Sequence, residues 1–98
     1  MAEKISGQDL KARKEEFVII DVREADEIES GKIDGSINMP LGLTIRNAKK
    51  KQIEDMRGKK ICTYCGTGYR GNIAADELKK EGFDAVTLEG GFASWTQS

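Results

Sequence analysis

The sequence contains no histidine, one proline and two cysteines among its 98 residues. Without histidine, neither Ser-His-Asp nor Cys-His catalysis is available, and histidine-ligated metal sites are excluded. Two cysteines cannot alone supply the four sulfur ligands of a structural zinc site. Any nucleophile must therefore be activated by backbone N–H groups and fixed charge, and we expect neither a metal nor a cofactor.

Long apolar runs and an excess of one charge are also missing. The longest wholly apolar run is Phe17-Val18-Ile19-Ile20, far short of the roughly 18 residues that a membrane-spanning helix needs. Sixteen basic and seventeen acidic residues leave a formal net charge of −1, which provides no positive field for nucleic acid. The polar N-terminus lacks a signal-peptide pattern, and two cysteines without an export signal fit a reducing compartment. We expect a cytoplasmic protein that binds neither nucleic acid nor membranes.

Strand-like and helix-like segments alternate along the chain. Apolar runs predict strands near residue 5 and at 17–22, 36–39, 60–64 and 86–88, and the two longest are typical of strands buried on both faces. Helical patterns are expected at 7–14, 24–30, 43–57 and 72–80, with a short helix after Gly91. This alternation predicts an α/β fold with right-handed crossovers. The length fits one domain that spans residues 1–98.

The stretch KICTYCGTGYRG, residues 60–71, carries the strongest chemical signal. A predicted strand runs into Cys65, a glycine-rich turn and an arginine, and helix-like sequence follows at once. Backbone N–H groups at a helix start have no intrahelical partner and bind anions. Gly66 and Gly68 allow the backbone to curl around a central atom. We therefore expect a loop whose N–H groups surround the Cys65 sulfur and stabilise a thiolate.

Three stretches together resemble one protein family. The loop Cys65-Gly66-Thr67-Gly68-Tyr69-Arg70 resembles the Cys-x-x-Gly-x-Arg active-site loop of rhodanese-like sulfurtransferase domains. A second stretch resembles the family's first signature: Asp21-Val22-Arg23-Glu24, then Glu27, then GKIDG at 31–35 and SINMP at 36–40. The third stretch, LEGGFASW at 88–95, is similar to the family's C-terminal signature. Two positions depart from the family pattern. Lys32 stands where histidine is usual, and Gly71 stands where serine commonly follows the arginine.

The resemblance implies a fold and a reaction. The fold is a rhodanese-like three-layer domain with a central five-stranded parallel sheet flanked by helices, and with the cysteine strand in the middle. The reaction is a sulfur transfer in which Cys65 is the catalytic nucleophile and carries a persulfide. The donor is thiosulfate or a similar small molecule, and the acceptor is cyanide, a thiol or a protein. The implied substrate-binding residues are Gly66, Thr67, Gly68, Tyr69 and Arg70, without any cofactor.

Several alternatives remain open from the residues themselves. Cys62-Thr63-Tyr64-Cys65 is a CxxC pattern, so a thiol oxidoreductase is one alternative. A phosphatase or arsenate reductase with a related loop is a second, although only four residues separate Cys65 from Arg70 here, whereas such loops have five. A third is a sulfur-carrier or interaction module that delivers the persulfide to a protein partner.

The charged residues near the loop have structural and functional interpretations. Arg70 either binds an anionic donor or holds the loop through a salt bridge. Asp21 and Arg23 end a predicted strand two residues apart, and we expect them to form a structural ion pair beneath the loop. Asp21 or Asp34 would have to protonate the leaving group in a phosphatase, but the spacing singles out neither of them.

Overall fold

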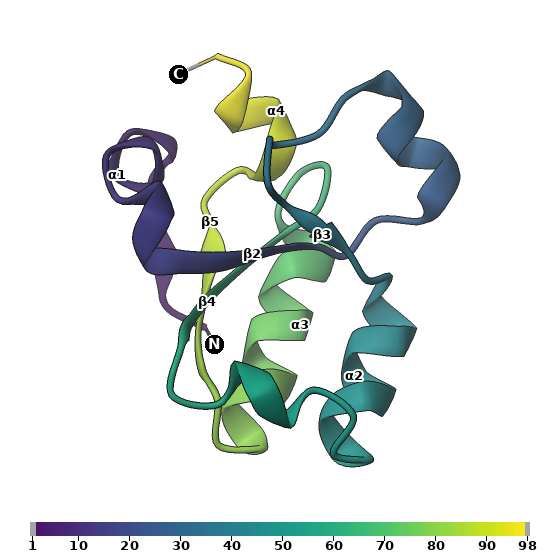
Figure 1. Cartoon of the computed structure of the whole chain (residues 1–98). Coiled ribbons are helices and arrows are strands. Elements are labelled where there is room, and N and C mark those ends of the chain that lie inside the picture. Colours follow the sequence, from purple (N-terminus) through teal and green to yellow (C-terminus); the bar gives the residue numbers. More distant parts are fainter. Residues whose placement is uncertain (1, 98) are drawn as a thin grey trace.

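A computed structural model describes residues 2–97, and in these residues five strands form one parallel sheet (Figure 1). The strands are β1 (Lys4–Ile5), β2 (Phe17–Asp21), β3 (Ile37–Asn38), β4 (Lys60–Tyr64) and β5 (Asp84–Leu88). Their order in the sheet is β1-β5-β4-β2-β3, which puts β4 in the middle between two five-residue strands. The expected α/β fold with a central five-stranded parallel sheet is therefore confirmed.

Helices cover both faces of this sheet. The helices are α1 (Gly7–Ala12), α2 (Leu41–Lys49), α3 (Tyr69–Lys80) and α4 (Gly91–Trp95), with 3-10 turns η1 (Lys14–Glu16), η2 (Ala25–Ser30) and η3 (Glu54–Met56). Figure 1 shows α2 and α3 side by side along one face, while α1 and α4 lie on the other side of the strands. No helix within residues 2–97 has the length and apolarity needed to cross a membrane.

The two faces of the sheet have separate apolar cores. Ile20 and Ile61 belong to the cluster under α2 and α3, whereas Ile19 and Cys62 belong to the cluster under α1 and α4. Successive side chains of a strand point to opposite faces, so a continuous apolar run supplies both clusters. Burying each isoleucine contributes roughly 2–3 kcal/mol. This two-sided burial fixes β2 and β4 at the centre of the molecule.

Two predicted helix boundaries are wrong. The long helix expected at 43–57 ends as α2 at Lys49, because Lys51 has a φ of 59°, a left-handed backbone that a right-handed helix cannot contain. The helix expected to start at Asn72 instead starts at Tyr69. As a result Tyr69 and Arg70 lie in the first turn of α3, directly above the end of β4.

Candidate functional site

Cys65 is the first residue after β4, and the loop that follows wraps around its sulfur. The Sγ atom accepts hydrogen bonds from the backbone N–H groups of Gly68 at 3.1 Å and Gly71 at 3.3 Å. Gly68 has a φ of 113°, which residues with a side chain rarely adopt, and this conformation turns the loop back over Cys65. The Cys65 residue is only 1% exposed. The loop therefore forms a closed cradle of N–H groups around the sulfur, as its glycines predict.

Further N–H groups of the loop remain unused. Within residues 2–97, those of Thr67, Tyr69 and Arg70 donate no hydrogen bond. Tyr69 and Arg70 are in the first turn of α3, where an α-helix leaves its N–H groups without intrahelical partners. The positive end of the α3 dipole lies at the same place. The cradle can therefore hold a second atom of negative charge beyond Sγ.

Gly71 brings α3 unusually close to the sheet. A Cβ atom at this position would lie 2.8 Å from the Thr87 hydroxyl and 3.1 Å from the Tyr64 Cα. The Thr63 hydroxyl donates to the Gly71 carbonyl at 2.7 Å, and the Thr87 hydroxyl donates to the Thr63 carbonyl at 3.1 Å. These bonds hold the Gly71 N–H beside Sγ. The Thr87 hydroxyl thus occupies the space next to Gly71, where the side chain of the family's usual serine would lie.

Sequence reasoning missed these two threonines. Thr63 and Thr87 are register partners in β4 and β5, and both are fully or almost fully buried. The signal that could have found them is a hydroxyl residue in each of two adjacent apolar strands, since a buried hydroxyl needs a hydrogen-bond partner.

The start of α4 fixes the other side of the loop. The N–H of Phe92 donates to the Cys65 carbonyl at 2.8 Å, and the N–H of Ala93 donates to the Gly66 carbonyl at 3.1 Å. Gly91 has a φ of 63°, and a Cβ there would lie 2.6 Å from the Cys65 carbonyl oxygen. Only glycine permits this approach, because the obstructing atoms belong to the backbone. The loop is therefore held between the first turns of α3 and α4.

Arg70 forms a two-pronged ion pair with Glu27 of η2. Its Nη1 lies 2.7 Å from Oε2 of Glu27, and its Nη2 lies 2.9 Å from Oε1. Glu27 Oε2 also accepts the backbone N–H of Glu24 at 2.8 Å. The hydrogen bonds from Arg70 and then from Glu24 lower the pKa of Glu27 from 4.5 to about 2. The structure shows the salt bridge expected in one interpretation of Arg70, with a partner that the sequence did not identify, and the Arg70 guanidinium also interacts with Cys65.

Asp21 and Arg23 form the expected ion pair, buried below the loop. Arg23 Nη2 lies 2.8 Å from Asp21 Oδ2, and Nε lies 3.0 Å from Oδ1. Arg23 Nη2 also donates to the Gly31 carbonyl at 2.7 Å, and the guanidinium stacks 4.8 Å from the Phe92 ring centroid. This pair links the end of β2, η2 and α4. It leaves the Asp21 carboxylate fully engaged and unsuited to protonating a leaving group.

Comparisons with known proteins identify the family of this chain. A sequence model of the rhodanese-like domain matches residues 6–98. The chain belongs to the rhodanese-like family.

Relatives of this rhodanese-like chain carry several functional descriptions. A rhodanese-related protein of Thermoplasma volcanium has a crystal structure with a TM-score of 0.83 and 33% identity, covering 97% of this chain and 91% of that one. A structure from Rhodopseudomonas palustris, described as a possible tyrosine phosphatase, has a TM-score of 0.85 and 30% identity, covering 98% and 80%. The putative sulfur carrier protein YrkF of Bacillus subtilis is 35% identical over 84% of this chain. The chain spans 43% of that protein, and from 20% to 75% of other curated relatives.

The second cysteine of this rhodanese-like domain is separated from the first by the sheet. Cys62 lies in the core cluster under α1 and α4, whereas Cys65 lies in the cluster under α2 and α3. Burial raises the pKa of the Cys62 thiol to about 12, so this thiol stays protonated at neutral pH. A disulfide requires Cβ atoms that approach within about 4.5 Å. Opposite faces of β4 do not offer this approach, which argues against the CxxC thiol oxidoreductase.

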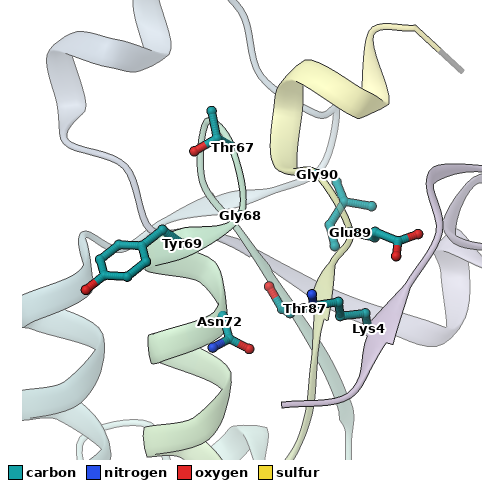
Figure 2. A pocket seen from close by; sticks show the side chains of 9 residues that line it. Lys4, Thr67, Gly68, Tyr69, Asn72, Thr87, Glu89 and Gly90 are labelled. Atoms are coloured by element: carbon teal, nitrogen blue, oxygen red, sulfur yellow. The ribbon is translucent and has the colours of Figure 1, made fainter. Parts of the chain in front are cut away.

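A shallow cavity of about 270 Å³ opens beside the rhodanese-like loop (Figure 2). Its walls combine loop residues with side chains from β1, α3 and the end of β5: Lys4, Thr67, Gly68, Tyr69, Asn72, Thr87, Leu88, Glu89 and Gly90. In Figure 2 the Tyr69 ring extends away from Lys4 and Glu89, and Tyr69 is 77% exposed. The outer side of the loop is therefore open to a substrate or a partner, although the Cys65 sulfur itself is enclosed.

Proposed function

We propose that this rhodanese-like chain is a sulfurtransferase that carries a sulfane sulfur as a persulfide on Cys65. The observation that carries the proposal is the cradle around Sγ, with two N–H groups on the sulfur and three more unused beside it. The Cys65 thiolate attacks the outer sulfur of a donor such as thiosulfate. The sulfur–sulfur bond of the donor breaks, and sulfite leaves with the electron pair. The product is a Cys65 persulfide whose outer sulfur carries the negative charge.

The second step passes the outer sulfur to an acceptor. The acceptor, cyanide in an assay or a thiol in the cell, attacks that sulfur, and the Cys65 thiolate is released. The outer sulfur is the atom that is transferred, so the acceptor attacks this atom and Sγ of Cys65 is the atom that leaves. Splitting one transfer into two displacement steps is the usual benefit of a covalent intermediate.

The loop residues have distinct roles in this proposal. Gly66 and Gly68 allow the backbone to surround the sulfur, and the N–H groups of Thr67, Tyr69 and Arg70 bind the outer sulfur of the persulfide. The Arg70 side chain acts through Glu27 to hold the first turn of α3. We place the reaction in the cytoplasm, because the low cysteine content of the sequence fits a reducing compartment.

A protein acceptor is the second candidate. The similarity to a putative sulfur carrier protein favours it, since a carrier uses the same persulfide and differs only in what receives the sulfur. Steady-state turnover with cyanide and with small thiols separates the two candidates. A carrier forms the persulfide but releases it slowly to every small acceptor.

Intact mass after incubation with thiosulfate tests the proposal. We expect one added sulfur atom on the wild-type chain and on Cys62→Ser, and none on Cys65→Ala. Cyanide should remove the sulfur as thiocyanate. Persulfide formation in folded Cys65→Ala would overturn the proposal, and so would hydrolysis of p-nitrophenyl phosphate through Cys65 without any persulfide.

A further inference from the structure

The positive charge of the loop is already compensated. Both terminal nitrogens of Arg70 bind the two carboxylate oxygens of Glu27, at 2.7 and 2.9 Å. The other arginine below the loop, Arg23, is paired in the same way with Asp21. These four groups sum to zero charge. An anion that enters the cradle therefore meets helix N–H groups but no unpaired guanidinium.

Glu27 is itself fixed by hydrogen bonds within η2 and its cap. It closes a capping box with Glu24, in which each side chain accepts the backbone N–H of the other residue. Its own carbonyl accepts the hydroxyl of Ser30 at 2.9 Å. With its pKa at about 2, Glu27 is ionised at every pH near neutrality. The carboxylate is thus a fixed negative charge beside the entrance to the cradle.

The η2 segment adds negative charge on the Glu27 side of the loop. The residues of η2 and its cap include four carboxylates and no basic side chain: Glu24, Asp26, Glu27 and Glu29. Glu27 and Arg70 have side chains that are 38% and 33% exposed, so their charges act on molecules that approach from solvent. These carboxylates repel a dianionic donor such as thiosulfate. They do not repel a donor whose sulfur is bound to an uncharged or positively charged group.

Resting on the proposed sulfurtransfer, we propose that Glu27 determines donor selectivity by disfavouring dianionic thiosulfate relative to hydropersulfides on uncharged or cationic thiols. In the favoured reaction, the Cys65 thiolate attacks the terminal sulfur of RS–SH. The RS–S bond breaks, RS⁻ leaves with the electron pair, and Cys65 becomes a hydropersulfide. Both donors deliver one sulfane sulfur, and their leaving groups are sulfite, which is a dianion, and a thiolate, which in cysteamine is accompanied by an ammonium group.

The test compares two donors, thiosulfate and the hydropersulfide of cysteamine, which carries an ammonium group. In Glu27→Gln the carboxylate charge is removed while the amide oxygen can still accept from Arg70. We expect kcat/KM for thiosulfate to rise about tenfold, as removal of one charge near a dianion predicts. The value for cysteamine hydropersulfide should stay constant or fall. Glu29→Gln is the matched control, because Glu29 is exposed in the same segment and has no partner within residues 2–97.

Salt dependence gives a second measurement that needs no variant. Repulsion by the η2 carboxylates predicts that kcat/KM for thiosulfate rises with ionic strength in the wild type, because salt screens the repulsion, and that it rises less or falls in Glu27→Gln, where one negative charge is gone. A steep fall in the wild type would overturn the inference, because it would reveal an uncompensated positive charge. An unchanged thiosulfate rate in folded Glu27→Gln, or an equal rise in Glu29→Gln, would also overturn it. Failure of both donors to load Cys65 would instead overturn the sulfurtransferase proposal itself.

Discussion

Replacing Gly91 with alanine should destabilise the protein far more than a change of one methyl group implies. At a φ of 63°, an L-residue with a side chain is strained by about 1–2 kcal/mol. The new Cβ would also lie 2.6 Å from the Cys65 oxygen and 2.8 Å from the Gly66 carbonyl carbon and oxygen. All of these are backbone atoms, so no rotamer change relieves the collision.

The collision must therefore move α4 away from the loop. That movement lengthens the bonds from Phe92 to Cys65 and from Ala93 to Gly66, each of which contributes about 1 kcal/mol. Strain and lost bonds together predict a loss of about 3–4 kcal/mol in the free energy of unfolding. Domains have about 5–15 kcal/mol in total, so the variant should remain folded but be much weakened.

Urea denaturation followed by circular dichroism measures this loss, provided that the slope m is unchanged. Gly58→Ala is the matched control, since Gly58 has a φ of 81° but nothing within 4 Å of its Cβ position. It should lose only the strain, about 1–2 kcal/mol. Gly42→Ala in α2, where the space is also open, should gain roughly 0.5–1 kcal/mol from its higher helix propensity. If Gly91→Ala loses no more than Gly58→Ala, the close approach of α4 to the loop is wrong.

Three further predictions concern the groups around the loop. Asp21→Asn should lower the free energy of unfolding by about 3–5 kcal/mol in urea titration, because Arg23 is then buried without a counter-charge; a loss below 1 kcal/mol would contradict this. The folded pKa of Glu27 lies below its unfolded value of 4.5, so its contribution to stability is complete above that pH and is lost as pH falls toward 2. Urea midpoints at successive pH values should fall more steeply in the wild type than in Glu27→Gln, and parallel curves would refute the assignment. Gly71→Ser should destabilise by about 1–3 kcal/mol through collision with the Thr87 hydroxyl, and Thr87→Ala should recover part of the loss in a double-mutant cycle.

The central strand and the glycine-rich turn around Cys65 could be predicted from the sequence because each depends on neighbouring residues. An apolar run between polar residues predicted β4 with both of its boundaries. A tight glycine turn and a helix after it follow from local backbone preferences, although the helix begins at Tyr69 and not at the predicted Asn72. The absence of histidine pointed directly to N–H groups as the means of stabilising Cys65.

The helix predicted at 43–57 is too long at its C-terminal end, and the cause lies in tertiary packing and not in the local sequence pattern. The apolar spacing there fits a helix, yet the chain leaves α2 at Lys49 and turns through Lys51. Ile53 then belongs to the same apolar core cluster as Ala48 of α2. Hydrophobic periodicity shows which residues are buried, but the backbone path between them depends on the space left by the sheet and α3.

The partners of the loop were decided only by the tertiary structure. Arg70 and Glu27 are 43 positions apart in the sequence, and Thr87 is 24 positions from Thr63. A parallel sheet brings the carboxyl ends of β2, β4 and β5 to one edge, whatever their separation along the chain. The strand order places η2 on one side of the cradle and the start of α4 on the other. Local sequence therefore determined that the Cys65 sulfur lies in a cradle of N–H groups, whereas the packing of distant segments decided that Arg70 is neutralised by Glu27.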